Sequence, residues 1–470
     1  MSEGAGHPMG RVRHVHFVGI GGAGMSGIAE VMHNLGYDVS GSDMKDSATT
    51  RHLRELGVRV DIGHSAGQVN GSDVLVVSGA IADDNSEVLA ARSKRIPIIP
   101  RAEMLAELMR FRHGIAVAGT HGKTTTTSLI ASLLAEGGMD PTYVVGGRLI
   151  STDSHARLGT GRYLVAEADE SDASFLHLQP VISVVTNIDA DHLETYAGDI
   201  HGLQAVFLEF LHHLPFYGLA VVCVDDPGVQ QILAKISKPL VTYALEAEAD
   251  FVAHGLEASA LMMRFSVAHG GDRQWLRVTL NLPGRHNVRN ALAAIAVATE
   301  LGVARERIAD ALLHFQGIRR RCEVLGTLAL EGKQVTVVDD YGHHPTEIAA
   351  TLDAIRAGWP GRRVAAIFQP HRYTRTRDLF NDFCRELSRF DALLLLEVYP
   401  AGEQPIAGAD SGALYRALVR RGRVAPVFLH QRADVAAALP GVLESGDILL
   451  VLGAGDIGTL GHELLRGHGN

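Results

Sequence analysis

Two glycine-rich turns constrain the fold of this chain more than any other feature of its sequence. The first, at residues 16–27, reads HFVGIGGAGMSG, and the second, at residues 117–127, reads VAGTHGKTTTT. In both, an apolar run precedes the glycines and a helix-like segment follows them. A strand, a glycine turn and a helix form the repeating unit of a parallel sheet, and the N–H groups that open the helix can bind an anion. The sequence therefore predicts an α/β protein with two anion-binding turns.

The first turn has the spacing of a dinucleotide-binding fingerprint. Gly19, Gly21 and Gly24 leave room for a tight turn and a diphosphate, and Asp43 ends the next expected strand. In a dehydrogenase such an acid binds a ribose, so a nicotinamide cofactor remains an alternative on this segment alone. A further alternative is that the glycines serve only the close packing of helix against strand.

The second turn is typical of a loop that binds the phosphates of ATP. Backbone N–H groups, the helix dipole and the Lys123 ammonium would converge on one anion, and Thr124 would offer its hydroxyl to Mg²⁺. The common P-loop spacing places a glycine where this chain has Val117, so the loop is a shorter variant. The alternative is a helix that is merely capped by Thr120, with Lys123 in solvent.

Acidic residues follow two further apolar runs, YLVAE and VISVVTN. The carboxyl ends of parallel strands meet at one edge of a sheet, so we expect these acids near the second turn. Carboxylate oxygens suit Mg²⁺, which neutralises charge during phosphoryl transfer. We expect one or two of them to bind metal and the others to be solvated. The acids and an accompanying histidine are Glu167, Asp169, Glu170, Asp172, Asp189, Asp191 and His192.

The chain of 470 residues is too long for a single hydrophobic core, and its pattern predicts three consecutive α/β domains. We place a Rossmann-like first domain at residues 1–108, a central P-loop ATPase domain at 109–320 and a C-terminal Rossmann-like domain at 321–470. The last apolar run leads into GAGDIG, a second copy of the first glycine spacing. The chain ends too soon after Gly458 for the complete unit that such a fingerprint requires.

Charge and cysteine content exclude several classes of protein. Lys and Arg number 43 against 53 Asp and Glu, so no overall positive field attracts nucleic acid or anionic lipid. No apolar run approaches the roughly 18 residues of a membrane span, and the N-terminus lacks the apolar core of a signal peptide. The three cysteines are far apart, which argues against a disulfide framework. We expect a soluble, cytoplasmic protein without nucleic-acid or membrane partners.

In order along almost the whole chain, its segments resemble the Mur ligases of peptidoglycan synthesis, and among them those that join L-alanine to UDP-N-acetylmuramate. The short Gly-Thr-His-Gly-Lys-Thr loop is similar to the family's own P-loop. The segments that carry the resemblance are HFVGIGGAGMSGIAE, GTHGKTTTT, EADESD, TNIDADHLE, PGRHNVRNALAA, DDYGHHPTEI, QPHRYTRT and GAGDIG.

The resemblance implies an ATP-dependent ligase that forms an amide bond between the lactyl carboxylate of UDP-N-acetylmuramate and L-alanine. An acyl phosphate would be the intermediate, and ADP and phosphate would be released. The first turn would then bind the UDP diphosphate and the second would bind ATP with Mg²⁺. The enzyme would be a monomer or a homodimer.

The resemblance also implies roles for individual residues. Lys123, His343, Arg372 and Arg375 would be catalytic, and the last three, with Tyr341, would close over the reacting groups and L-alanine. Thr124, Glu167 and His192 would bind metal. The nucleotide would contact Gly119, Thr120, His121, Gly122, Lys123, Thr124 and Thr125, with its adenosine at His286, Asn287 and Asn290. The UDP-sugar would contact Gly21, Gly22, Gly24, Ser42, Asp43, His64 and Ser78.

Three details of the third domain stay open at this point. Arg372 and Arg375 are three residues apart and would share one face of a helix. His343 or another group of the third domain would accept the proton of the alanine amine. Alternatively, one member of the His343–His344 pair would only orient a loop. The arginines at 319–321, at the domain junction, would either pin the hinge or reach a phosphate.

One departure separates this chain from sister ligases that add later amino acids. Those carry a carboxylated, metal-bridging lysine after the TN-D-DH motif, whereas residues 193–217 here contain no lysine. The departure agrees with the alanine-adding members and argues against a carbamate-bridged second metal.

Three other functions compete with this interpretation. The first is an NAD-dependent oxidoreductase, which would leave the ATP loop and its acids unexplained. The second is a related ligase that acts on another carboxylate, such as a folate or a recycled cell-wall peptide. The third is a nucleotide-gated scaffold, which would bind ATP without substrate-dependent turnover.

Overall fold

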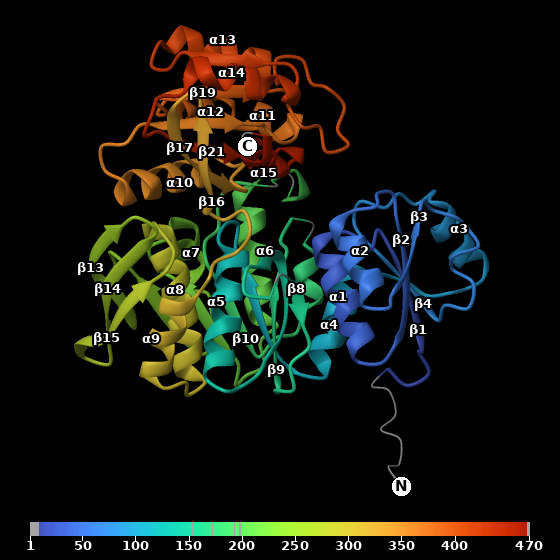
Figure 1. Ribbon diagram of the computed structural model, residues 1–470. Helices are drawn as coiled ribbons and strands as arrows, with labels where there is room; N and C mark the ends of the chain where they lie inside the picture. Colours follow the sequence, from blue (N-terminus) through green and yellow to red (C-terminus); the bar gives the residue numbers. More distant parts are fainter. Residues whose placement is uncertain (1–8, 153, 172, 192, 197–198, 468–470) are drawn as a thin grey trace. The chain divides into compact units, whose positions relative to one another are not determined.

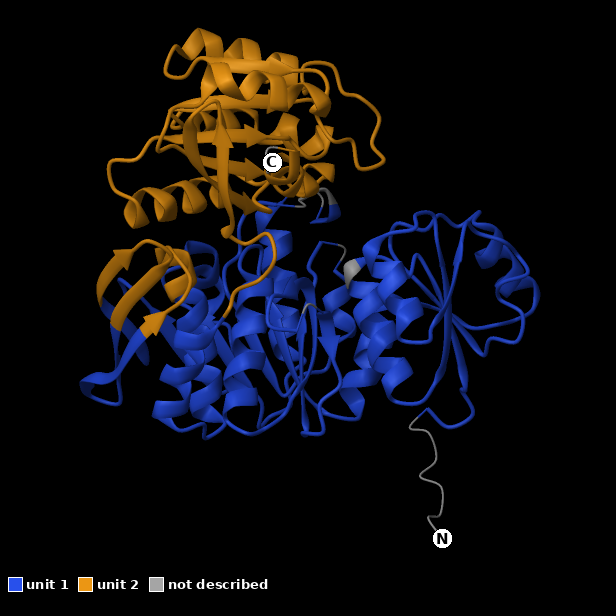
Figure 2. Cartoon of the chain, viewed as in Figure 1, with its two compact units in different colours: residues 1–254, 266–278, 289–315 blue, residues 255–265, 279–288, 316–470 orange. Residues whose placement is uncertain are grey.

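The computed structural model describes residues 9–152, 154–171, 173–191, 193–196 and 199–467. It contains three sheets, of five, ten and six strands, each flanked by helices (Figure 1). The expected architecture of three α/β domains is thereby confirmed, while the exact domain boundaries remain a prediction. By internal packing the chain forms two compact units (Figure 2). Unit 1 comprises residues 1–254, 266–278 and 289–315, and unit 2 comprises 255–265, 279–288 and 316–470.

The first sheet is parallel throughout and has the strand order β3-β2-β1-β4-β5. Its helices α1, α2 and α4 lie on one face and α3 on the other (Figure 1). Because the order reverses beside β1, a crevice for ligands is expected at the carboxyl ends of the central strands. The strands are β1 (His14–Val18), β2 (Asp38–Asp43), β3 (Arg59–Ile62), β4 (Val74–Val77) and β5 (Ile98–Pro100). The helices are α1 (Ala23–Asn34), α2 (Ala48–Glu55), α3 (Ser86–Ser93) and α4 (Arg101–Arg110).

The second sheet places β6 between β9 and β10, and both neighbours run parallel to it. The loops after these three strands carry the second glycine turn, the EADESD acids and the TNID segment, so the sheet brings them to one edge. The full order is β15-β14-β13-β12-β11-β10-β6-β9-β7-β8. The helices are α5 (Lys123–Glu136), α6 (Ile200–His212), α7 (Pro227–Leu233), α8 (Arg285–Glu300) and α9 (Arg305–His314).

Several strands of the second sheet were not predicted. The outer members include antiparallel partners, as in the pair β7–β8, whose register is interrupted by an irregularity. The strands are β6 (His113–Ala118), β7 (Thr142–Leu149), β8 (Ser154–Arg157), β9 (Tyr163–Glu167), β10 (Ile182–Val185), β11 (Leu219–Cys223), β12 (Leu240–Ala244), β13 (Phe251–Ser259), β14 (Met262–His269) and β15 (Asp272–Leu280).

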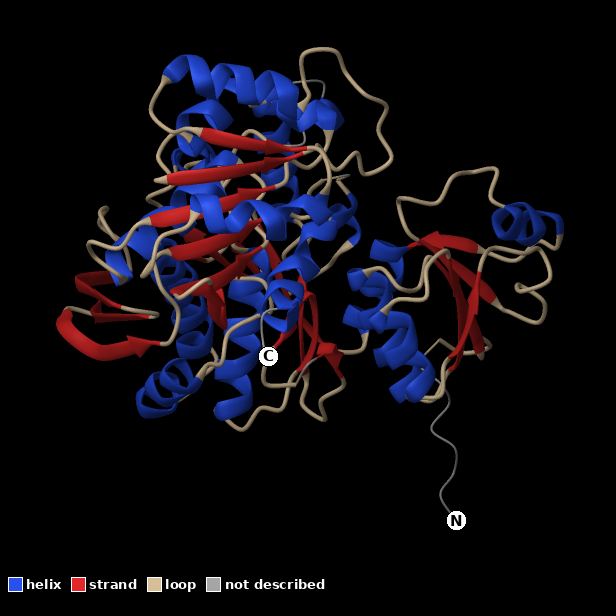
Figure 3. Cartoon of the chain, turned by 45° about the horizontal axis from the view of Figure 1, so that its top comes forward, coloured by secondary structure: helices blue, strands red, loops and turns tan. Residues whose placement is uncertain are grey.

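The third sheet lies in unit 2 (Figure 2) and has the order β16-β17-β21-β18-β19-β20. Figure 3 shows its strands with helices on both faces. Only β16 is antiparallel to its neighbour, and a bulge before Gly326 hides its alternation in the sequence. The strands are β16 (Glu323–Leu330), β17 (Lys333–Asp340), β18 (Val364–Phe368), β19 (Ala392–Leu396), β20 (Pro426–Leu429) and β21 (Ile448–Leu452). The helices are α10 (Pro345–Gly358), α11 (Tyr373–Asp378), α12 (Phe380–Leu387), α13 (Ser411–Arg421), α14 (Val435–Val442) and α15 (Leu460–Gly467).

Arg320, in the junction segment, belongs to unit 2 and contacts other residues of that unit. Its Nε lies 3.3 Å from the Oδ2 of buried Asp339, and its backbone carbonyl accepts the N–H of Tyr341 at 2.7 Å. A Cβ on Gly458 would overlap the Arg320 guanidinium, which also donates to the carbonyl of Gly453. Gly458 therefore makes room for the Arg320 side chain, and these contacts, all within unit 2, hold the junction residue to the end of β17.

Among the described residues, no helix combines the length and the apolar character that crossing a bilayer requires.

The Asp339 carboxyl predicts a pH dependence of stability. Burial raises its pKa to about 7, although Arg320 opposes the shift. An unfolded aspartate has a pKa near ~3.9, so between about pH 4 and pH 7 the folded state binds more protons than the unfolded state. The free energy of unfolding of unit 2 should therefore fall as pH rises through this window, by on the order of 4 kcal/mol at most.

The Asp339→Asn variant should flatten this decline in urea titrations of the full chain. The exposed Asp434, changed to Asn, serves as the control and should leave the decline unchanged. An unaltered pH slope in Asp339→Asn would contradict the assignment.

Candidate active site

The second glycine turn has a backbone that only glycine adopts readily. Gly119 has a φ of 134° and Gly122, the N-cap of α5, has a φ of 82°. A Cβ on Gly122 would lie 2.5 Å from the Asn290 Oδ1, and one on Gly119 would overlap the Thr186 hydroxyl. The alternative in which Thr120 caps the helix is wrong, since its hydroxyl accepts the N–H of Asp189 at 2.9 Å.

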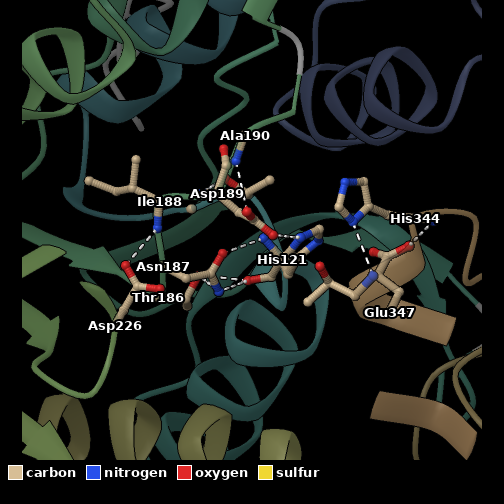
Figure 4. A network of polar contacts seen from close by, with 12 residues as sticks. His121, Thr186, Asn187, Ile188, Asp189, Ala190, Asp226, His344 and Glu347 are labelled. Carbon is tan, nitrogen blue, oxygen red and sulfur yellow. Dashed lines mark hydrogen bonds and ion pairs between the residues drawn. The ribbon is translucent and has the colours of Figure 1, made fainter. Parts of the chain in front are cut away.

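The TNID segment after β10 braces this turn (Figure 4). Asn187 accepts the N–H of His121 at 2.8 Å through its Oδ1 and donates to the His121 carbonyl at 2.9 Å through its Nδ2. The Thr186 hydroxyl donates to the same carbonyl at 2.7 Å. His121 Nε2 also lies 3.1 Å from the Asp189 carboxylate. Our sequence analysis missed Thr186 and Asn187, although the TN dipeptide at a buried strand end was the available signal.

Lys123 is the residue most strongly held in the turn. Its Nζ lies 2.8 Å from each carboxylate oxygen of Glu170 and donates to the carbonyls of Gly119 at 2.7 Å and Thr120 at 3.2 Å. The expectation of a solvated Lys123 under the capping alternative is thus also wrong. Burial alone would lower the pKa of Lys123, but the carboxylates of Glu170, Asp169 and Glu167 raise it above its ordinary value.

The other acids of EADESD are engaged separately. Glu167 ends β9, is half-buried and accepts the N–H of Gly146 at 2.7 Å. Asp169 lies 3.4 Å from the Arg101 guanidinium. Thr124 and Thr125 are buried in the first turn of α5. Two expected members, Asp172 and His192, lie outside the described residues.

The structure places the three candidate adenosine residues at the start of α8. Asn290 belongs to unit 1 and lies against Gly122 of the turn. His286 and Asn287 belong to unit 2, where the Asn287 amide donates to the Pro283 carbonyl at 2.7 Å. The structure thus brings only Asn290 to the second turn within unit 1.

At the first turn, Asp43 binds the glycine backbone. Its Oδ2 accepts the N–H of Gly21 at 2.9 Å, and its Oδ1 accepts that of Lys45 at 3.1 Å. A Cβ on Gly21 would lie 2.9 Å from the same carboxylate, and one on Gly24 would lie 3.1 Å from an Arg101 nitrogen. Crowding is therefore severe at Gly21, whereas at Gly24 the flexible end of the Arg101 side chain would have to shift slightly.

Ser42 and His64 meet in a buried polar network beside this turn. Both contact Glu87, from α3, with the Ser42 hydroxyl donating to it at 3.0 Å and His64 Nδ1 lying 2.8 Å away. His16 Nε2 lies 2.7 Å from Glu87 Oε2, the oxygen that also accepts the Ser42 hydroxyl, whereas His64 contacts Oε1. Burial alone would raise the pKa of Glu87, but these hydrogen bonds hold it below its usual value. The Ser78 hydroxyl lies at Gly19, so the candidate UDP-sugar residues share one sheet edge.

Our sequence analysis did not identify Glu87 or His16 as part of this network. An acid in the first turn of a helix is common for reasons of capping, so no sequence signal singles out Glu87.

Unit 2 brings together the candidate residues that follow β17 and β18. The rings of Tyr341 and His343 are 5.3 Å apart, and those of His343 and His371 are 5.8 Å apart. His371 stacks on Tyr399, while Arg375 is buried beside the His371 carbonyl. Our sequence analysis missed His371 and Tyr399. Burial, together with Arg375 and Arg372, lowers the pKa of His371 to about 4, so its imidazole is neutral near pH 7.

Two expectations about this cluster are resolved. Arg372 lies just before α11 with a φ of 71° and pairs with Glu403 at 3.7 Å, so it does not share a helical face with Arg375. Of the histidine pair, His344 caps α10: its Nδ1 accepts the N–H of Thr346 at 3.3 Å, and its own N–H donates to Glu347 (Figure 4). The loop-orienting role thus falls to His344.

The Gly122→Ala variant tests the geometry of the second turn. A left-handed backbone costs a residue with a Cβ about 1–2 kcal/mol, and the new methyl would also displace Asn290. We expect a lower melting temperature and loss of the thermal stabilisation that ATP gives.

Gly138→Ala is the matched control, because Gly138 has a φ of 78° but open space around its Cβ position. It should cost similar backbone strain and keep the response to ATP. Equal responses in both variants would contradict the crowding argument.

Comparison with known proteins assigns the chain to a family. The model for "Mur ligase family, catalytic domain" matches residues 14–113, that for "Mur ligase middle domain" matches 117–298, and that for "Mur ligase, glutamate ligase domain" matches 320–455. A UDP-N-acetylmuramate–L-alanine ligase of Methylococcus capsulatus is 59% identical over 456 residues, which are 97% of this chain and 96% of that protein.

Two solved structures are also similar. The UDP-N-acetylmuramate-alanine ligase of Thermotoga maritima has a TM-score of 0.83 at 28% identity and covers 98% of this chain and 99% of its own. A murein peptide ligase of Psychrobacter arcticus has a TM-score of 0.71 at 26% identity, covering 97% and 99%. With matches along nearly its entire length, the chain belongs to the Mur ligase family.

Proposed function

We propose that this chain is the ATP-dependent ligase that joins L-alanine to UDP-N-acetylmuramate in peptidoglycan synthesis. The observation that carries the proposal is the 59% identity, over 97% of the chain, to a ligase of that name. Among the solved structures, the murein peptide ligase has a TM-score of 0.71, against 0.83 for the alanine ligase. Peptide recycling is therefore the weaker candidate for this chain.

ATP binds at the second turn in this proposal. The turn exposes helix N–H groups beside the Lys123 ammonium, which suits the terminal phosphates. Asn290, packed against Gly122, places an amide at the same turn, and we assign it with His286 and Asn287 to the adenosine. Residues 119–125 line the phosphates.

The donor chemistry at this turn fits Mg²⁺. Glu167 supplies a half-buried carboxylate near Lys123. Thr124, which follows Lys123 in the sequence, supplies a hydroxyl. Hard oxygen donors of this kind suit Mg²⁺, which when bound neutralises charge that develops during phosphoryl transfer. We assign Thr124 and Glu167 as ligands of one Mg²⁺, and His192 with Glu167 as ligands of a second.

UDP-N-acetylmuramate binds at the first turn in this proposal. Gly21, Gly22 and Gly24 allow the diphosphate to approach the helix start, and Ser42, Asp43, His64 and Ser78 provide polar contacts at the same sheet edge. The Asp43 carboxylate already occupies the Gly21 N–H. The match to the Mur ligase family along nearly the whole chain disfavours the alternative in which Asp43 grips the ribose of a nicotinamide cofactor.

The residues of unit 2 handle the activated acid and the amine. Transfer of the γ-phosphoryl group to the lactyl carboxylate gives an acyl phosphate, which the amine of L-alanine attacks. A tetrahedral intermediate then expels phosphate. Arg372 and Arg375 balance the negative charge of these species, and Tyr341 and His343 orient the alanine. The Arg320 and Arg321 guanidinium groups, near the Tyr341 ring at 5.1 Å and 5.2 Å, hold that ring in place.

The reaction is tested by substrate omission. Phosphate release should require ATP, Mg²⁺, UDP-N-acetylmuramate and L-alanine together, because the acyl phosphate forms only on the lactyl carboxylate. Glycine, L-serine and L-alanyl-γ-D-glutamyl-meso-diaminopimelate replace alanine as controls. Faster turnover with the tripeptide would favour peptide recycling, and release that ignores the UDP-sugar would refute the ligase.

The Lys123→Ala variant tests the division of labour between the two turns. Removing the ammonium should lower kcat by about 10²–10³-fold or more, since it removes charge stabilisation of the transferred group. UDP-N-acetylmuramate affinity, measured by calorimetry, should stay within about twofold. An equal loss of both would show that the two turns do not act separately.

A further inference from the structure

In the proposed function Lys123 binds the phosphates of ATP. In the structure its ammonium already binds a carboxylate of the same chain, that of Glu170. The Glu170 carboxylate faces its Nζ with both oxygens at 2.8 Å. An ammonium has three N–H donors, and here four oxygens share them, from Glu170, Gly119 and Thr120. Lys123 therefore has no donor left for a phosphate.

The Glu170 contact is enclosed. The Glu170 side chain is 3% exposed and the Lys123 side chain 18% exposed. An ion pair this far from water is stronger than one on the surface, so separating the two groups is costly. Of the two side chains, that of Lys123 is the more exposed to solvent, so a ligand can approach the pair from the lysine side.

The backbone of Glu170 is fixed in place. Its carbonyl accepts the Tyr196 hydroxyl and the N–H of Ala173, the latter at 3.1 Å. Two hydrogen bonds thus fix the backbone from which the Glu170 carboxylate reaches Lys123. Displacing the contact therefore requires the Glu170 side chain to change rotamer while its backbone stays in place, and the incoming phosphate must offset the cost of separating the pair.

We propose that Glu170 is an internal competitor that occupies the position of a terminal phosphate on Lys123 and so sets the affinity for nucleotide phosphates. The inference rests on the proposed function, in that the second turn binds ATP. When the triphosphate arrives, its oxygens replace the Glu170 carboxylate on Lys123. When products leave, the carboxylate returns, which favours release of ADP and phosphate.

The test compares Glu170→Gln with the full chain of natural sequence in EDTA, so that metal plays no part. The amide keeps the shape of the side chain but loses its charge, and ATP and ADP should bind about tenfold more tightly, a gain of ~1.4 kcal/mol. Adenosine, which has no phosphate, should bind equally to both proteins in the same titrations.

Asp169→Asn is the matched control. It removes the same charge one residue away, but Asp169 pairs with Arg101 and makes no hydrogen bond to Lys123. It should leave the ATP affinity within about threefold. An equal gain in both variants would show a general charge effect and overturn the proposal, as would unchanged or weaker ATP binding in Glu170→Gln.

A second measurement tests whether the gain in affinity depends on the Lys123 ammonium. In the Lys123→Met background the further change Glu170→Gln should not alter ATP affinity, because the competition needs the ammonium. A gain of tenfold in that background would overturn the proposal. If ATP binds to none of these proteins, including the natural chain, the proposed function fails instead.

Discussion

The position of β6 between β9 and β10 is the constraint on which the candidate active site depends. Three segments far apart in the sequence, GTHGKT, EADESD and TNID, each follow one of these parallel strands. The loops that follow adjacent parallel strands leave the sheet at the same edge. The strand order alone therefore brings the glycine turn, the acids and Asn187 together. A different strand order would leave Lys123 without Glu170 and the turn without Asn187.

Much of this arrangement could be predicted from the sequence. The strands HVHFV, HGIAVA and YLVAE are buried along almost their whole length, and such runs are readable because a parallel sheet is covered on both faces. The helix at 123–136 was predictable from the glycines before it and after it. The acids at the ends of β9 and β10 pointed to the correct edge of the sheet.

Other parts were not predictable for physical reasons. β16 is an edge strand with a bulge at Gly326, so its apolar alternation is broken. The position of Arg372 depends on a positive φ that no pattern in HRYTRT predicts. Glu170 and Glu87 differ from their acidic neighbours only in what surrounds them after folding. A sequence shows that acids are present, but only packing decides which one binds Lys123 and which one binds Arg101.

The bonds of Arg320 have a further consequence for unit 2. This residue ends the junction segment, and its carbonyl holds the N–H of Tyr341 while its side chain pairs with Asp339 on β17. The segment is thus tethered directly to the strand end that bears Tyr341 and His343. Loss of the Arg320 guanidinium would therefore remove two supports at once, the partner of buried Asp339 and the cation beside the Tyr341 ring.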